Sequence, residues 1–294
     1  MNKIIYILTA LPLLFASCSS SEPAVDESVQ VTFNATLTAD GASRGDATVA
    51  DKVVCATFKD GSELTTLRQV IDIRDGRSIV YTPRLAKGVE YQVAFWAMKD
   101  GAYNATDMKN VRPADAVYTG DPERLDCFTN CTEPFTVTGA DTKTVTLKRP
   151  MARINLGVTD GDLQAVNALG YTLSSVKLTV SSAAMAYNAV TGLACGQVQP
   201  VVMTMPVVSG EVLDISGVNF NKIASYQIFT EGNNVTLSCT IYGVSNSGGG
   251  EEIALAEHEL LNVPVAVNKN TNIVGNLVTG NVNYTISTYI NYDN

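Results

Sequence analysis

Short segments in which apolar and polar residues alternate set the strongest limit on how this chain can fold. In residues 29–37 every second side chain is apolar, as expected for a strand with one buried face. Asp-Gly pairs at Asp60, Asp75 and Asp100 lie between such segments and supply the positive φ that hairpin turns require. No long window has the i, i+3, i+4, i+7 apolar spacing of an amphipathic helix. The pattern predicts an all-β protein.

Two β-prone segments meet near the middle of the 294-residue chain, at Arg149 and Pro150. Because Pro150 has no backbone N–H for a ladder hydrogen bond, we expect one strand to end and another to begin there. Each side of this joint has the size of one domain, and the whole chain is too long for a single small core. We therefore predict two Greek-key β-sandwich domains in tandem, over residues 29–149 and 150–294.

The alternation also assigns individual elements. It fades over residues 103–134, where we expect a long, loop-like insertion in the first domain. Residues 161–169 of the second domain have the pattern of one short helix, with Asp160 or Asp162 as its cap. Strands are predicted, among others, at residues 51–58, 90–98, 173–180, 185–187 and 198–205.

The first residues have the pattern of an export signal. A basic start at Lys3 is followed by an apolar segment, residues 4–15, that is too short to span a bilayer, and by a small-residue cleavage site that ends at Cys18. This predicts a bacterial lipoprotein signal peptide over residues 1–18. The alternative is an ordinary secretory peptide with an incidental cysteine. In either case we expect an exported protein without a transmembrane helix, with a flexible tether over residues 19–28.

Composition argues against several functions. The formal net charge is −9 and no basic patch is present, which argues against nucleic acid as a partner. His258 is the only histidine, so any Ser-His-Asp or Cys-His mechanism would need it, yet its alternating neighbours predict a solvent-facing strand residue. No stretch nominates a carboxylate pair for glycoside hydrolysis, which sequence spacing alone leaves open. We expect no enzymatic activity, no metal and no other cofactor.

Two questions about side-chain chemistry stay open at this point. Cys127 and Cys131 have the spacing to close a small disulfide loop in an oxidising exterior, or to stay as free thiols in an anaerobic one. Tyr91, Trp96 and Tyr103 have rings that can stack on sugars, although an aromatic core cluster is the commoner arrangement. We expect the core cluster.

The chain ends in a second well-alternating segment, residues 283–292. One face of this expected strand carries Tyr284, Ile286, Thr288, Ile290 and Tyr292. Two arrangements fit the pattern. The strand closes its own sheet, or it leaves the domain and pairs with a groove on another molecule through main-chain hydrogen bonds and alternate side-chain pockets.

Two segments, LKRPMARINLGV at residues 147–158 and NKNTNIVGNLVT at residues 268–279, resemble the fimbrillin-like lipoproteins (type V pilins and related surface proteins) of the Bacteroides group. The resemblance implies that Cys18 becomes the lipidated first residue of the processed chain. It also implies that an arginine-directed protease cuts after the first strand, at Arg44, and that the removed strand leaves a groove for a neighbour's terminal strand, here residues 283–292. Arg44 as an ordinary loop residue remains the alternative.

On this resemblance we expect a structural or adhesive cell-surface protein, a major or accessory pilus subunit held at the outer membrane by its N-terminal lipid. Its partners would be other pilin subunits or further copies of itself, joined by strand exchange, with a host or glycan ligand as a further candidate. The alternative is a surface glycan-binding lipoprotein of a polysaccharide-uptake system. Exposed aromatic residues on one flat face would favour that alternative, and a deep apolar groove under the first strand would favour the pilin.

Overall fold

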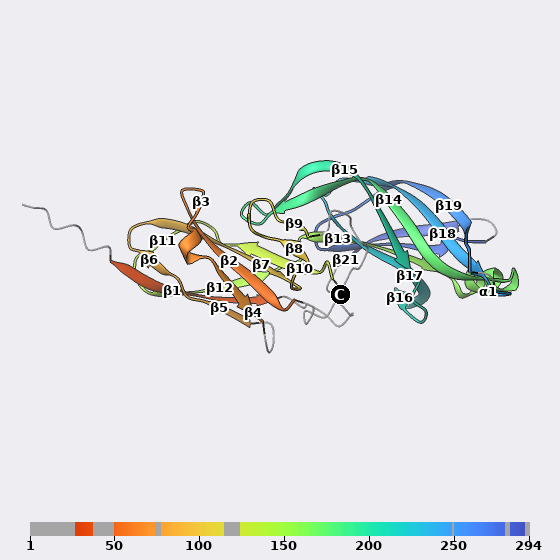
Figure 1. Cartoon of the computed structure of the whole chain (residues 1–294), viewed down its shortest axis with the longest axis horizontal. Coiled ribbons are helices and arrows are strands. Elements are labelled where there is room, and N and C mark those ends of the chain that lie inside the picture. Colours follow the sequence, from red (N-terminus) through yellow and green to blue (C-terminus); the bar gives the residue numbers. More distant parts are fainter. Residues whose placement is uncertain are drawn as a thin grey trace, which may run out of the picture.

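The computed structural model describes residues 27–37, 50–73, 78–114, 124–248, 250–279 and 283–291, and it gives the backbone alone for residues 288–291. The described chain consists mainly of strands, with one α-helix and one short 3-10 helix. It is elongated, with the strands of residues 28–147 at one end and those of residues 151–291 at the other (Figure 1). The predicted all-β fold class is confirmed.

The N-terminal part contains two sheets that pack on each other. The first has the order β12-β1-β5, with β6 also paired to β1. The second has the order β10-β7-β2-β3, with β11 paired to β7 and β4 paired to β2. A separate short hairpin is formed by β8 and β9, and the 3-10 helix spans Thr65–Leu67. The bounds are β1 Ser28–Leu37, β2 Lys52–Lys59, β3 Ser62–Glu63, β4 Gln69–Asp72, β5 Ser78–Tyr81, β6 Arg84–Ala86, β7 Glu90–Met98, β8 Tyr103–Asn104, β9 Arg112–Pro113, β10 Cys127–Cys131, β11 Phe135–Thr136 and β12 Asp141–Leu147.

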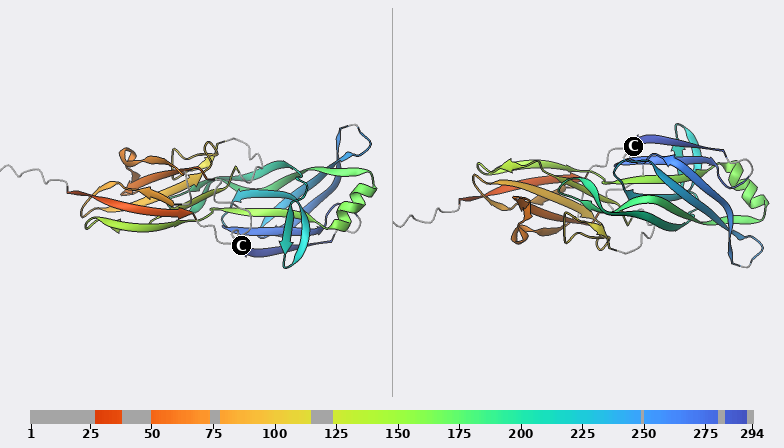
Figure 2. Two further views of the ribbon diagram at one scale, coloured as in Figure 1. Left: turned by 90° about the horizontal axis from the view of Figure 1, so that it is seen from below. Right: turned by 90° about the horizontal axis from the view of Figure 1, so that it is seen from above.

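The C-terminal part is one nine-stranded sheet that folds around an apolar cluster. Its order is β19-β18-β14-β17-β13-β20-β21, with β15 paired to β14 and β16 paired to β17. A single residue pair, Ala184 with Phe229, joins β14 to β17, so the strands on either side form two layers around one core (Figure 2). The bounds are β13 Met151–Val158, β14 Tyr171–Asn188, β15 Leu193–Pro206, β16 Val212–Ile215, β17 Val218–Phe229, β18 Val235–Ser245, β19 Glu252–Val263, β20 Lys269–Asn276 and β21 Asn283–Asn291.

The helix α1 (Asp160–Ala168) lies at the outer end of the C-terminal part (Figure 1). The expected caps were wrong, because Thr159 is the N-cap and its hydroxyl accepts the backbone N–H of Asp162 at 3.1 Å. Gly170 follows the helix with a φ of +85°, a conformation that glycine adopts without strain. Within the part of the chain that the structure describes, no helix is long and apolar enough to cross a membrane.

The expected loop-like insertion at residues 103–134 was wrong for much of its described part. It contains β8, β9 and β10, and β10 pairs with β7 from Ala94 to Met98. Met108, Val111 and Leu125 are buried in the same apolar cluster as the second domain. These side chains cover the outer face of the β7 sheet, and they do so without the regular alternation that marks a long strand.

The joint between the two parts is buried. As expected, β12 ends at Leu147 and β13 begins at Met151, with Pro150 between them. The Arg149 guanidinium forms two hydrogen bonds to Asp126, at 2.7 and 2.9 Å, and lies 4.5 Å from the centre of the Phe128 ring. The joint is therefore part of the core and not an exposed linker.

Candidate functional site

The first strand, β1, is an inner strand of its sheet. It runs parallel to β12 over residues 31–37 and antiparallel to β5 and β6 on its other side. This strand also lies at the start of the described chain. Its removal would therefore leave a groove bounded by β12 on one side and by β5 and β6 on the other, without breaking any later connection.

Apolar side chains hold β1 to the layer beneath it. The Phe33 ring lies 6.0, 6.1 and 5.8 Å, centre to centre, from the rings of Tyr81, Phe95 and Phe135. Burial of a large apolar side chain contributes about 1.5–3 kcal/mol before ordering costs are subtracted. The space that β1 fills is therefore apolar along its length. The other inward-facing side chains are Val29, Val31, Ala35 and Leu37.

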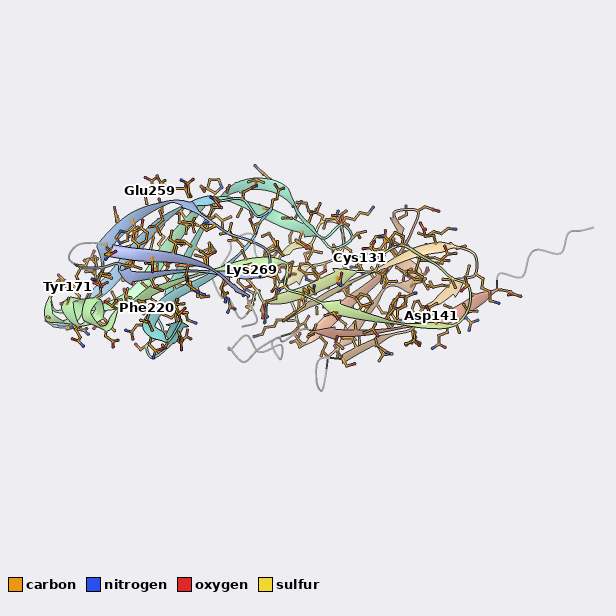
Figure 3. The ribbon with its side chains drawn as sticks, turned by 180° about the vertical axis from the view of Figure 1, so that it is seen from behind. Cys131, Asp141, Tyr171, Phe220, Glu259 and Lys269 are labelled. Carbon is orange, nitrogen blue, oxygen red and sulfur yellow. The ribbon has the colours of Figure 1, made fainter. Side chains whose placement is uncertain are left out.

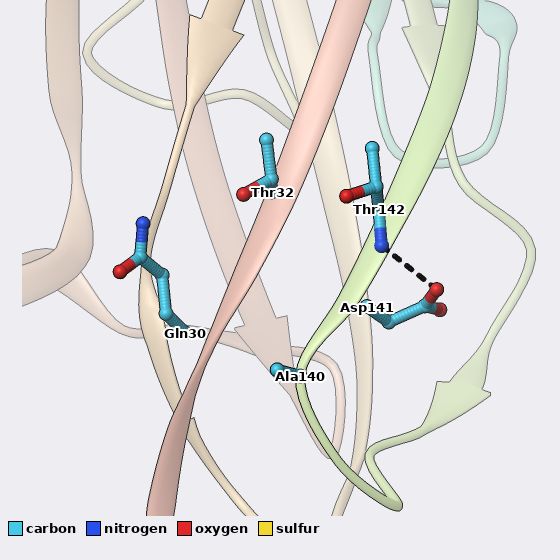
Figure 4. A pocket seen from close by; sticks show the side chains of 5 residues that line it. All are labelled: Gln30, Thr32, Ala140, Asp141 and Thr142. Carbon is cyan, nitrogen blue, oxygen red and sulfur yellow. Dashed lines mark hydrogen bonds between the residues drawn. The ribbon is translucent and has the colours of Figure 1, made fainter.

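The opposite face of β1 is polar. A hollow of about 420 Å³ lies on this face. Its lining residues, drawn in Figure 4, are Gln30, Thr32, Ala140, Asp141 and Thr142. The Asp141 carboxylate accepts the backbone N–H of Thr142 at 2.7 Å, and its hydrogen bond with Lys143 lowers the pKa of Asp141. Because this carboxylate is paired within its own strand, we assign no ligand to the hollow.

The last strand, β21, lies at the edge of the C-terminal sheet. It pairs antiparallel with β20 and has no second strand neighbour among the described residues. In both views of Figure 2 this dark blue strand runs along the margin of the second domain. Tyr284 and Ile286 pack half-buried against the core, on the face that the alternation predicted. The structure thus shows the first of the two expected arrangements, in which the strand closes its own sheet.

Several predicted site positions are described in part or not at all. The backbones of Thr288 and Ile290 pair with Thr271 and Asn270 of β20. Lipidation and proteolytic processing stay predictions, because their positions are not described. The candidates that lie outside the described residues are Cys18, Arg44 and Tyr292.

The expectation that His258 faces solvent was wrong. This residue of β19 is half-buried, and its Nε2 atom lies 2.5 Å from the carbonyl oxygen of Leu277, the first residue after β20. Because a carbonyl oxygen only accepts, Nε2 carries the hydrogen of this bond. The ring holds the chain that leads into the last strand. Its neighbour Glu259, labelled in Figure 3, is exposed.

The cysteines of β10 are free thiols. Cys127 and Cys131 are four residues apart in one strand, which separates their Cα atoms by about 13 Å, beyond the reach of a disulfide. Burial raises the pKa of Cys131 to about 12 and also raises the pKa of Cys127. Such thiols are poor nucleophiles at neutral pH. Within the described ranges no group of three His, Cys, Asp or Glu side chains could hold a metal ion.

The aromatic side chains form core clusters, as expected. The Trp96 ring lies 5.3 Å from Tyr103, 5.8 Å from Tyr187 and 6.3 Å from Phe229, centre to centre. Tyr91 is buried in the N-terminal core. Every aromatic side chain that the structure describes is buried or half-buried, so the described surface has no aromatic platform for sugar rings.

Three solved structures resemble this arrangement. A "putative cell adhesion protein" from Bacteroides eggerthii has a TM-score of 0.54 at 10% identity, over 89% of this chain and 95% of that one. The fimbrial anchor protein Mfa2 from Porphyromonas gingivalis has a TM-score of 0.48 at 13% identity, over 84% and 90% of the two chains. The tip fimbrial protein Mfa3 from the same organism, truncated at its C-terminus, has a TM-score of 0.47 at 14% identity, over 90% and 99%.

The resemblance inferred from the sequence is confirmed at the level of the fold, since the chain is similar in structure to the Bacteroides eggerthii protein. The chain belongs to the Family of unknown function (DUF6562), whose model matches residues 22–294. None of the curated proteins matches it.

Proposed function

We propose that this chain is a fimbrillin-like structural or adhesive protein of the cell surface, a major or accessory pilus subunit that assembles by strand exchange. In this proposal Cys18 carries the lipid that anchors the uncut chain to the outer membrane, and cleavage after Arg44 separates β1, together with that lipid, from the rest of the chain. A neighbour's last strand then fills the groove. The position of β1, an inner strand that one cut in the following connection would separate from the chain, is the observation that carries the proposal.

The two strands have matching patterns. β1 places apolar side chains at alternate positions from Val29 to Leu37, and the terminal segment alternates in the same way from Tyr284 to Tyr292. The outward faces of the two strands are also similar, because each carries neutral polar residues such as Thr32 in β1 and Thr285 in the terminal strand. A terminal strand can therefore replace β1 without placing a charge in the apolar space.

The edges of the C-terminal sheet favour β21 as the strand that exchanges. Edge strands that avoid pairing with other chains are short or carry charges or prolines. The edge strand β15 contains Pro200 and Pro206, β19 contains glutamates such as Glu257, and β16 has four residues. The nine residues of β21 include neither a proline nor a charged side chain. It is the edge with the least protection against intermolecular pairing.

The glycan-binding alternative finds no support on the described surface. It requires exposed aromatic rings on a flat face, and the described rings are buried or half-buried. The similar solved structure from Bacteroides eggerthii supports the fold.

Strand exchange can be tested on the purified chain. We expect a trypsin-like protease to cut after Arg44 under native conditions and, in the presence of a peptide of residues 283–294, the residue 29–37 fragment to leave as the peptide enters. Exchange should be slow, because ladder hydrogen bonds and buried side chains hold β1 after the cut. Mass spectrometry of the complex measures both species.

The controls separate cleavage from exchange. Arg44→Gln should keep β1 and take up no peptide, and a peptide with Ile286→Lys should bind poorly because its lysine would enter the apolar space. Full-length cleaved protein should form ladders that a truncation before Asn283 abolishes. A cleaved chain that stays monomeric at high concentration and takes up no peptide contradicts the proposal.

A further inference from the structure

One buried carboxylate ties the connection between β20 and β21 to helix α1. Asp162 is 3% exposed. Its Oδ2 accepts the backbone N–H groups of Leu277 and Val278 at 2.7 and 2.8 Å. Its Oδ1 accepts the backbone N–H and the hydroxyl of Thr279 at 2.8 and 2.6 Å. Three consecutive backbone N–H groups and one hydroxyl therefore surround a single negative charge.

Further contacts hold the residues just before this point. The backbone N–H of Thr159 donates to the carbonyl of Gly275 at 3.1 Å, and its hydroxyl donates to the Asn276 side chain at 2.6 Å. From the other side, His258 donates to the carbonyl of Leu277. Every residue from 275 to 279 thus makes a hydrogen bond to helix α1, its cap or β19.

The strand that follows is held differently. Among the described residues, β21 pairs with β20 alone, and this ladder consists of hydrogen bonds between neutral groups. Tyr284 and Ile286 are only half-buried, and the hydroxyl of Ser287 is buried without a hydrogen-bond partner. Hydrogen bonds to a buried charge are about twice as strong as those between neutral groups. The connection is therefore fixed more firmly than the strand it leads into.

We propose that Asp162 is a positioning residue, the fixed root of the terminal strand: it holds Leu277–Thr279 on helix α1 so that β21 separates from β20 while β20 and the helix stay in place. Its meaning for assembly rests on the strand exchange proposed above. The four steps from Thr279 to Asn283 span at most about 14 Å. A neighbour's groove must then begin within that distance of the root.

Hydrogen exchange on the full chain tests this root. We expect the amides of β21 to exchange at least about tenfold faster than those of Leu277–Thr279 in the unmodified protein. In Asp162→Asn an amide group faces the same N–H donors, so the Leu277–Thr279 amides should exchange about tenfold faster than before. Thr279→Val removes only the hydroxyl donor and should act in the same direction with a smaller effect.

Asp160→Asn is the matched control, because Asp160 is an exposed acid of the same helical turn. Its carboxylate accepts a hydrogen bond from the Asn221 side chain, whereas the hydrogen bonds of Leu277–Thr279 to this turn go to Asp162. It should leave the exchange of residues 277–279 unchanged. Two results would contradict the inference that Asp162 fixes this connection. The first is that residues 277–279 exchange at the same rate as β21 in the unmodified protein. The second is that their exchange rates are unchanged in folded Asp162→Asn and Thr279→Val. If the amides of residues 277–279 exchange slowly but the cleaved chain takes up no peptide, the inference about Asp162 stands and the proposed strand exchange is contradicted.

Discussion

Arg149 illustrates at the residue scale how a long-range pair fixes the joint. Arg149 and Asp126 are each 2% exposed, and the guanidinium donates two hydrogen bonds to the carboxylate in bidentate geometry. From the sequence, Arg149 is recognisable only as a basic residue at a strand boundary. Its partner lies 23 positions earlier in a segment without strand alternation, so local pattern cannot indicate the pair.

Replacing Arg149 alone should be costly. Arg149→Met leaves the buried Asp126 carboxylate without its cation, and we expect the free energy of unfolding to fall by about 3–5 kcal/mol. The double variant Arg149→Met, Asp126→Leu removes both charges and should lose less. Urea unfolding followed by Trp96 fluorescence measures both. If Arg149→Met were as stable as the unmodified chain, Arg149 would not be what compensates the charge of the Asp126 carboxylate.

Asp162 shows the same limit at the candidate site. The sequence suggests it as a helix cap, since it is an acid near the start of a helical pattern. Its carboxylate instead binds a connection 115 residues further along the chain, and Thr159 takes the capping role. Alternation predicts the inward face of β21 at Tyr284 and Ile286, because period two is a local property. The hydrogen bonds that fix Leu277–Thr279 before this strand are tertiary contacts, and a local pattern does not predict them.

At the scale of elements, alternation predicts strands well where the ladder is regular. The expected strand at residues 90–98 coincides with β7, and residues 29–37 fall within β1. The eighteen-residue strand β14 appears in the sequence as two shorter ones, because register shifts after Val180 and after Ala184 interrupt its period. The bulges, and not a turn, separate the two patterns.

The two faces of β1 should respond differently to substitution. Phe33→Ala removes a buried ring that packs on three other rings, and we expect a loss of about 3–5 kcal/mol. Asn34→Ala, on the adjacent outward position, should change stability by no more than about 0.5 kcal/mol. Chemical denaturation of both variants measures the difference. Equal losses would mean that the ladder, and not the apolar face, holds the strand.

At the scale of the whole molecule, the two sandwiches share one apolar cluster. Trp96 and Tyr103 of the N-terminal part pack on Tyr187 and Phe229 of the C-terminal part. The sequence indicates the two parts through the proline at the joint. The sequence does not predict that the two parts pack on each other. The apolar residues that cover the β7 sheet, such as Met108, lie in a segment that was predicted to be a loop.

The shared cluster should make the chain unfold as one unit. We expect a single calorimetric transition whose measured enthalpy equals the van't Hoff enthalpy, since separating the parts would expose Trp96 and its neighbours to water. Scanning calorimetry of residues 27–294 tests this. Two resolved transitions, or a calorimetric enthalpy well above the van't Hoff value, would show that the parts unfold independently.

The parallel pairing of β1 with β12 has a mechanical consequence. The two strands run toward the joint together, β1 from Ser28 at the far end of the sheet and β12 through Pro150 into β13. A pull between the N-terminal end and the second domain therefore loads these strands at opposite ends (Figure 1). The load acts along the strands, so their hydrogen bonds share the tension and do not open one after another. As long as β1 stays attached to the chain, it resists traction in shear, and a single cut behind it abolishes that resistance.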